Sequence, residues 1–391
     1  MPGTGATLEA EWSFLQAACS EISRQQKIDR IRLLSRQSIR WNLLLDLADR
    51  HGTQPLLYQA LVGIEDADAD VVPPAEMSAL KQHYQINLHK ALFVARELIH
   101  IVEHLSALGI EVMPYKGVAL AEMAYGDIAL RHAGDIDLLI RPQDFPSIRD
   151  AARELGYTPH LSLSPAEERA YLKSGYECAF DGAAGPNLLE VQWAIQPSFY
   201  AVDFDMHALF QRAVTVSVAG HPMKTPSAED LLLVLSAHAA KHVWGRLVWL
   251  CDIARIMGLP TLDWTWIASQ AKSLGIVRIL RVTMLLANRL LSATIPAAAQ
   301  ASLPEDPGTQ ALVDEIQTHI ASEGVFNVES LAYFRLMMRL RERPLDRLRL
   351  LQRLALTPGP GEWQAIRLPA PLFPLYRLVR LSRLAARFVR S

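Results

Sequence analysis

Two aspartates stand two residues apart inside an apolar run, and this pattern constrains the fold more than any other feature of the chain. Residues 134–140 read G-D-I-D-L-L-I, which is typical of a short strand. Because side chains alternate between the two faces of a strand, Asp135 and Asp137 would share one face. Two like charges beside a core cost several kcal/mol unless a cation neutralises them, so the pattern indicates a divalent metal site. The alternative is a pair of solvated acids on an edge strand.

The length and composition of the chain indicate a folded protein with two or three subdomains. The chain has 391 residues, of which 50% are hydrophobic and 20% are charged. No apolar run reaches the roughly 18–20 residues that a membrane span requires, and the N-terminus does not resemble a signal peptide. We therefore expect a cytoplasmic protein with no membrane span. The three cysteines form no C-x-x-C pair, which argues against a disulfide framework or a zinc knuckle; they are Cys19, Cys178 and Cys251.

Hydrophobic periodicity divides the chain into four regions and predicts an α+β fold. Helical spacing of apolar residues dominates at both ends, whereas short strand-like runs separated by turn residues dominate the middle. We expect a small mixed β-sheet core flanked by N-terminal and C-terminal helical regions. The predicted regions are an N-terminal helical region (1–108), the core (109–226), a helical domain (227–330) and an Arg-rich helical C-terminal region (331–391).

Turn and capping residues set the expected boundaries of individual elements. Gly109 should end a long helix that begins near residue 75, and Ser227 should cap a helix that runs to residue 243. Breaks are expected at 66–74 and at the P-G-P-G segment 358–361. The expected elements of the core are strands at 110–115, 135–141, 176–180 and 188–194, helices at 117–125 and 145–155, and a hairpin at 214–224.

Residues on both sides of the aspartates form an ordered set with them. A Lys116-Gly117 turn and Arg131 precede the pair, and Glu190 follows in the run L-L-E-V-Q-W. This set resembles the opening of the nucleotidyltransferase superfamily, which has a polymerase-β-like fold, and in particular the branch labelled uncharacterised nucleotidyltransferase. The resemblance continues through residues 238–252 and covers roughly the middle third of the chain. It implies that the core is a nucleotidyltransferase core.

The resemblance also implies a reaction and a set of metal ligands. Members of the superfamily move a nucleoside monophosphate from a nucleoside triphosphate such as ATP to an acceptor hydroxyl and release diphosphate, and two Mg²⁺ or Mn²⁺ ions clamp the reacting oxygens. In this chain Asp135 and Asp137 would bind both ions. Glu190 would complete the site and could take the proton of the acceptor. The alternative for Glu190 is an ordinary surface glutamate.

Lys116, Gly117 and Arg131 are the predicted phosphate-binding residues. Gly117 would open a helix whose first amides face phosphate oxygens, and Lys116 would neutralise them, although an ordinary strand-ending turn is the alternative. Arg131 could bind phosphate or pair with the acids. Superfamily members usually carry a small hydroxylated residue or a second glycine after the first glycine. This chain has Val118 there, which removes a side-chain phosphate ligand.

The helix that follows Ser227 carries three basic side chains on one face. His238, Lys241 and His242 follow the i, i+3, i+4 spacing of a helix face. One interpretation is a cationic face turned toward the triphosphate or the acceptor, and another is ordinary packing of the histidines at a domain junction. Zinc binding by the two histidines is a third interpretation, which lacks a third ligand in the sequence.

The C-terminal region differs from the rest of the chain in charge. Residues 335–390 contain 13 arginines, no lysine and three acids, a formal charge of +10 within a chain of net charge −2. Arginine and leucine alternate there at helical spacing, which suits RNA, an anionic membrane surface or an acidic partner peptide. The alternative is an amphipathic helix that packs on the acidic body of the protein.

Together these patterns predict a Mg²⁺-dependent nucleotidyltransferase. The acceptor stays open among peptides, natural products, RNA and proteins, and the base preference stays open as well. Two alternative functions are a catalytically degenerate nucleotide-binding scaffold, which Val118 favours, and an RNA-directed binder or enzyme that uses the Arg-rich tail.

Overall fold

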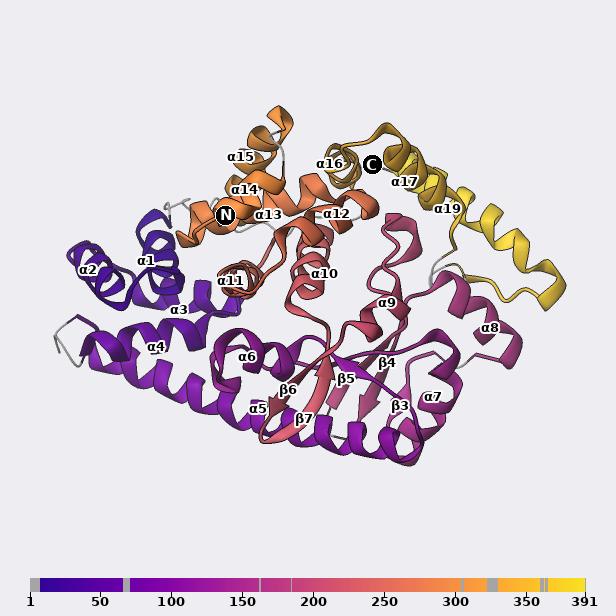
Figure 1. Cartoon of the computed structure of the whole chain (residues 1–391), viewed down its shortest axis with the longest axis horizontal. Helices are drawn as coiled ribbons and strands as arrows, with labels where there is room; N and C mark the ends of the chain where they lie inside the picture. Colours follow the sequence, from indigo (N-terminus) through magenta and orange to yellow (C-terminus); the bar gives the residue numbers. More distant parts are fainter. Residues whose placement is uncertain are drawn as a thin grey trace.

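The computed structural model shows an α+β protein in which a small mixed sheet lies between helices, as the sequence predicts (Figure 1). It describes residues 8–65, 71–161, 163–183, 185–303, 306–321, 330–358, 362 and 365–390. Most of the predicted break at 66–74 and of the predicted loop at 358–361 therefore lies outside the described residues. Among the described helices, none is both long enough and apolar enough to cross a bilayer.

Five helices form the start of the chain, and the last of them lies under the sheet. Helix α5 begins with Pro74 in its first turn and ends just before Gly109, whose φ of +73° turns the chain away. Its 34 residues run along the lower edge of the molecule in Figure 1. The bounds are α1 Glu9–Cys19, α2 Arg24–Ser35, α3 Trp41–Arg50, α4 Gln54–Glu65 and α5 Pro74–Ala107.

Five strands form the main sheet in the order β1-β2-β5-β4-β3. The β2–β5 pair is parallel, and the other neighbouring pairs are antiparallel. The first strand is shorter than predicted, because Pro114 has no N–H to donate to a ladder. The bounds are β1 Met113–Pro114, β2 Ile136–Leu139, β3 Thr158–Pro159, β4 Glu177–Gly182 and β5 Gly185–Gln192.

The two faces of this sheet differ in chemistry. One face packs with α5 and with α7 (Phe145–Glu154) in a single apolar cluster, and each buried aliphatic side chain contributes about 1.5–3 kcal/mol relative to exposure. The strand residues of that cluster include Ile136, Leu138, Leu189 and Val191. The opposite face carries carboxylates and is turned toward two later helices, α10 (Ala228–Lys241) and α11 (Leu247–Met257).

Three further helices and a hairpin complete the core region. The elements β3, α8 and α9 were not predicted. Helix α8 starts with a capping box, in which Ser164 accepts the amide of Glu167 and the Glu167 carboxylate accepts the amide of Ser164, so its signal was present in the sequence. The bounds are α6 Gly117–Tyr125, α8 Pro165–Ser174, α9 Met206–Gln211, β6 Val214–Val218 and β7 His221–Thr225.

Most of the described residues after the hairpin are helical. Helix α10 begins after Ser227, whose hydroxyl accepts the amide of Asp230 as predicted. It ends at Lys241 rather than at residue 243, because Val243 and Trp244 adopt φ values of +51° and +49° that no helix contains. The boundaries of the four predicted regions stay predictions. The later helices are α12 Trp264–Leu274, α13 Val277–Leu291, α14 Ala297–Ser302, α15 Pro307–Ala321, α16 Leu331–Arg339, α17 Pro344–Leu356 and α19 Tyr376–Arg390.

Candidate active site

A pocket of about 450 Å³ separates the carboxylate face of the sheet from α10 and α11. Strand residues line one side of it, and residues of the two helices line the other. Gly117 adjoins this pocket through its neighbour Lys116. The predicted site residues that line the pocket are Lys116, Arg131, Asp135, Asp137, Glu190, His238, Lys241 and His242.

Two carboxylates face each other at the strand side of the pocket. The parallel register of β2 and β5 sets Asp137 opposite Glu190, so both side chains leave the same face of the sheet. Gln192, two residues along β5, places its Nε2 at 3.2 Å from Asp137 Oδ1 and at 3.1 Å from Glu190 Oε2. A single amide nitrogen therefore lies within hydrogen-bonding distance of both carboxylates.

Glu177 brings another carboxylate to the same point. It lies opposite Gln192 in the β4–β5 pair, and its Oε2 is 3.3 Å from the same Nε2. The Tyr115 hydroxyl donates to Gln192 Oε1 at 2.6 Å, so the amide nitrogen is turned toward the acids. Tyr115, Glu177 and Gln192 were not predicted. The two-residue spacing of Glu190 and Gln192 was a signal for Gln192, whereas Glu177 emerges only from the strand pairing.

Gly117 allows the loop before β2 to approach α6. It has a φ of +55°, and a Cβ at this position would lie 3.1 Å from the backbone oxygen of Asp135. A side chain at position 117 would meet both a strained backbone and a close contact. The backbone of Asp135 thus lies close to Gly117, and Asp135 lines the pocket together with Asp137.

Lys116 places positive charge against the acids. Its Nζ lies 3.0 Å from Asp137 Oδ1, and Asp137 is only 4% exposed. Lys116 is also the N-cap residue of α6, and within the described part of the chain no side chain caps the first amides of this helix. Uncapped amides beside a lysine at a helix N-terminus are a favourable place for phosphate oxygens.

Burial among other acids raises the pKa of three carboxyl groups of the pocket. Burial, with repulsion from Asp137, Glu177 and Asp135, raises the pKa of Glu190 to about 8. Burial also raises the pKa of Asp135, and repulsion from Asp137 adds to that shift. The pKa of Glu177 is raised by burial as well. A bound cation would relieve the repulsion among these groups.

Arg131 reaches the pocket wall, yet its guanidinium pairs with an acid from another helix. Arg131 Nε donates to both carboxylate oxygens of Asp252 on α11, at 3.2 and 3.1 Å, and the Tyr125 hydroxyl donates to the same carboxylate at 2.8 Å. Asp252 is fully buried. Of the two roles left open for Arg131, the structure shows pairing with an acid, although not with Asp135 or Asp137. Phosphate binding by Arg131 stays a prediction.

The three basic side chains of α10 line the pocket, but the two histidines are neutral at pH 7. Burial, with nearby cations of which Lys116 has the largest effect, lowers the pKa of His238 well below its usual range. Burial, followed by the charge of Lys241, lowers the pKa of His242 to about 3. The two rings lie 4.8 Å apart and each lies 5.3 Å from the Trp249 ring. The positive charge of this face therefore comes from Lys241, whose own pKa is lowered by burial and by the charge of Lys116.

The side chains as they stand do not form a complete metal site. Among the described residues, no group of three or more His, Cys, Asp or Glu side chains is arranged to hold a metal ion. Neither the histidine pair as a zinc site nor the carboxylates as a magnesium site is therefore complete among the described residues. Lys116 and Gln192 donate to Asp137 directly in this arrangement.

The comparison with protein families bears on what this pocket is for. The family model described as uncharacterised nucleotidyltransferase matches residues 37–292. The chain belongs to this nucleotidyltransferase family. Among solved structures, the nucleotidyltransferase is similar to an antigenic nucleotidyltransferase-like protein from Paracoccidioides brasiliensis, with 16% identity, a TM-score of 0.32 and coverage of 53% of this chain and 95% of that one. No curated protein gives a significant match.

The family match covers the whole carboxylate face of the sheet. Lys116, the aspartate pair, Glu190 and the basic face of α10 all lie within residues 37–292. Membership supports a general role in nucleotidyl transfer. The small mixed sheet with helices on both sides is also the α+β architecture expected of a nucleotidyltransferase.

Proposed function

We propose that this nucleotidyltransferase moves a nucleoside monophosphate from a nucleoside triphosphate to an acceptor hydroxyl, releases diphosphate and depends on Mg²⁺ or Mn²⁺. The observation that carries the proposal is the strand register that sets Asp137 opposite Glu190, with Asp135 just before the same strand. Carboxylates gathered from neighbouring strands are what metal-assisted phosphoryl transfer requires.

The chemistry of the donors suits a hard divalent cation. Asp135, Asp137 and Glu190 offer only carboxylate oxygens, which Mg²⁺ and Mn²⁺ prefer. The raised pKa values of Asp135 and Glu190 support the same conclusion, because burial and then repulsion from neighbouring carboxylates disfavour their charged forms, which a cation would stabilise. Lys116 and Gln192 now donate to Asp137, so we expect both to give way when an ion binds.

Each part of the pocket would have a separate task. A bound ion would supply positive charge to the reacting phosphate. Lys116 and the first amides of α6 would bind and orient the triphosphate, with Lys241 neutralising charge from the opposite wall. Glu190 in its carboxylate form would take the proton of the acceptor hydroxyl. The hydroxyl oxygen then bonds to the α-phosphorus as the bond from that phosphorus to diphosphate breaks.

Diphosphate release tests this function. The nucleotidyltransferase is incubated with a nucleoside triphosphate, Mg²⁺ and cell extract as a source of acceptor. We expect Asp135→Ala to abolish release without unfolding the protein, whereas Asp46→Ala, at an exposed position of α3, should release diphosphate at the wild-type rate. Equal release by the wild type and Asp135→Ala would refute the assignment of the site.

A degenerate nucleotide-binding scaffold is the second candidate, and two observations favour it. Val118, which replaces the usual small phosphate ligand, is 2% exposed and packs in the apolar cluster under the sheet. Lys116 also already pairs with Asp137. Calorimetry with a nucleoside triphosphate, combined with the diphosphate assay, separates the two functions. A scaffold would bind the nucleotide and release no diphosphate with any extract.

A further inference from the structure

The C-terminal helices expose an unusual concentration of aliphatic side chains. Of the sixteen large hydrophobic residues that are exposed in the described part of the chain, nine fall between residues 345 and 381. Single exposed leucines are normal on a soluble protein, whereas a concentration of them marks an interaction surface. We call these nine residues the C-terminal surface: Leu345, Leu348, Leu351, Leu356, Ile366, Leu372, Leu375, Leu378 and Leu381.

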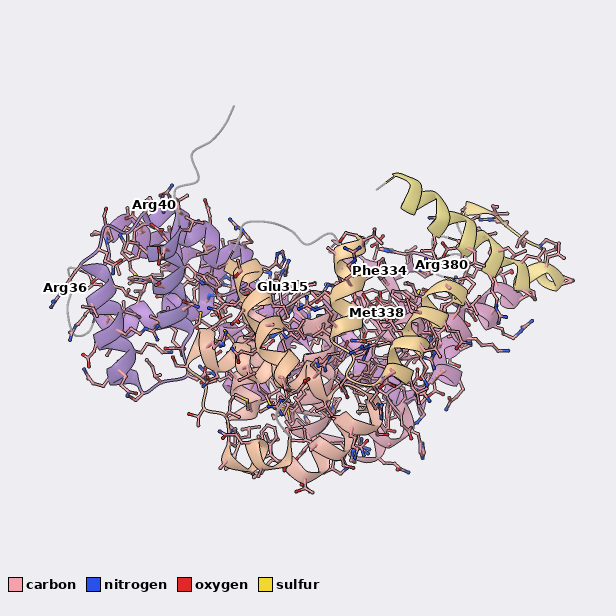
Figure 2. All side chains as sticks on the ribbon, turned by 90° about the horizontal axis from the view of Figure 1, so that it is seen from above. Arg36, Arg40, Glu315, Phe334, Met338 and Arg380 are labelled. Carbon is pink, nitrogen blue, oxygen red and sulfur yellow. The ribbon has the colours of Figure 1, made fainter. Side chains whose placement is uncertain are left out.

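The elements that carry the C-terminal surface lie together at one end of the molecule. Helices α17 and α19 pack against each other, and the short 3-10 helix Ala370–Leu375 packs against α19 (Figure 1). Figure 2 shows Arg380 of α19 at the end of the molecule opposite to Arg36 and Arg40. Arg36 directly follows α2, and Arg40 directly precedes α3. The exposed leucines therefore concentrate far from the N-terminal helices.

Helix α17 is fixed to the body of the protein by its other side. Arg353 donates through both terminal nitrogens to the Asp203 carboxylate, at 2.6 Å each. Leu350 is buried, whereas Leu345 and Leu348, one turn apart, are 67% and 61% exposed. The helix thus uses one side for attachment and leaves leucines on another side in solvent.

The exposed charge beside these leucines is positive. The acids of this stretch are engaged inside the protein: Asp346 and Glu362 are 5% and 2% exposed, and Glu342 accepts two backbone amides of α13. The Arg349 side chain is 64% exposed, with one terminal nitrogen 3.7 Å from a carboxylate oxygen of the buried Asp346, and Arg377 is also exposed. The C-terminal surface consequently presents leucine and arginine side chains together, and the exposed Asp203 carboxylate is paired with Arg353 of α17.

We propose that the C-terminal surface binds the anionic headgroup region of a lipid bilayer, with the chain as a peripheral and not a spanning protein. Aliphatic side chains enter the interface while arginines meet anionic headgroups, which is the chemistry of interfacial amphipathic helices. RNA would call for exposed aromatic rings, and the nine residues of the surface are all Leu or Ile. A second copy of the same surface would bring like charges together.

Vesicle co-sedimentation of the full chain tests the proposal. We expect the wild type to bind vesicles that contain phosphatidylglycerol and not vesicles of pure phosphatidylcholine, and we expect added salt to weaken the binding. Combining Leu345→Ser, Leu348→Ser, Leu378→Ser and Leu381→Ser should lower the partition coefficient by at least about tenfold. The matched control combines Leu33→Ser and Leu92→Ser, which are exposed on α2 and α5, and it should bind as the wild type does.

Arginine variants test the contribution of positive charge to vesicle binding. Arg349→Glu combined with Arg377→Glu should weaken vesicle binding severalfold and flatten its dependence on salt, because two headgroup contacts are reversed in sign. The thermal midpoint of each variant should stay within a few degrees of the wild type, since all of these side chains are exposed.

Four results would overturn the proposal. The first is no binding of the wild type to anionic vesicles at low salt, which needs no variant. The second is wild-type binding by the quadruple serine variant. The third is a wild-type dimer by light scattering that the serine variant disrupts, without vesicle binding, which would make the surface an interface between copies. The fourth is RNA binding that the serine variant retains, without vesicle binding.

Discussion

The two faces of the central sheet share the same strands but have opposite energetic consequences. On β2, Leu138 is fully buried in the cluster with α5 and α7, whereas its neighbour Asp137 is buried among other acids. On β5, Val191 and Glu190 repeat the contrast. The apolar face stabilises the fold through burial. The acidic face is unfavourable by itself, because burial and repulsion from the neighbouring acids disfavour the charged form of Glu190 and raise its pKa to about 8.

This contrast indicates where the protein gives up stability for function. A fold that needed only stability would place apolar residues on both faces of a sheet that helices cover on each side. Perturbed carboxyl groups gathered in a pocket are instead characteristic of catalytic and binding sites. We therefore expect activity to depend on the acidic face and stability on the apolar face.

The largest effect is expected from Asp137→Asn on the acidic face. It keeps the shape of the side chain and removes a charge at the centre of the pocket, so nucleotidyl transfer should fall by at least about 10³-fold, or about 4 kcal/mol in the activation barrier. Loss of the buried partner of Lys116 destabilises the fold while relief of the repulsion on Glu190 stabilises it, so the thermal midpoint should change little. Initial rates and thermal unfolding measure both quantities, and transfer at the wild-type rate would place the chemistry elsewhere.

Leu138→Ala on the apolar face should lower stability and leave activity nearly unchanged. Its side chain is fully buried, so its truncation should lower the free energy of unfolding by about 2–5 kcal/mol. The rate per folded molecule should stay close to that of the wild type, because the side chain points away from the pocket. Urea unfolding and an assay at low temperature test this, and a variant that is fully stable but inactive would break the comparison.

Glu190→Gln should change the pH dependence of stability in metal-free protein. The folded-state pKa of Glu190 is about 8, above its usual value of 4.5, so its favourable contribution is complete below pH 4.5 and is lost as the pH rises through 8. Relative to the variant, the wild type should therefore lose about 1–3 kcal/mol between pH 5 and pH 8. Urea unfolding in EDTA at several pH values measures the difference. Parallel curves for the two proteins would show that Glu190 is not perturbed.

The smallest effect is expected from Gly117→Ala at the start of α6. The positive φ costs about 1–2 kcal/mol for a residue with a Cβ, and the contact with the Asp135 oxygen adds to that cost. Gly126→Ala is the matched control, because Gly126 has a φ of +68° and open space around it. Gly117→Ala should be the less stable of the two and should also lose activity. Identical behaviour would mean that the close approach to Asp135 has no importance.

Much of the fold could be predicted because local signals were strong. Helix α6 spans Gly117–Tyr125 as expected, and Gly126 takes a φ of +68° directly after its end. The D-I-D strand was recognised from its alternation of apolar and acidic residues. Helix α8 was missed although Ser164 and Glu167 form its capping box.

The candidate site could be predicted only as a set of residue types. The pairing of β2 with β5 joins segments that are far apart in the sequence, so no local pattern reveals it. Glu190 could therefore be predicted from the family resemblance and not from geometry. The partner of Arg131 stands 121 residues away, at Asp252, and no local pattern links them. The lowered pKa of His238 comes from burial and then from the charge of Lys116, and both arise only in the folded protein.

The most direct test of the central claim follows the two ends of the triphosphate. Nucleoside triphosphate labelled at the α-phosphate or at the γ-phosphate is incubated with Mg²⁺, cell extract and either wild-type protein or Asp137→Asn. We expect the wild type to pass only the α-label to an acceptor and to release the γ-label as diphosphate, and we expect the variant to do neither. Transfer of the γ-label, or equal transfer of the α-label by both proteins, would contradict the central claim.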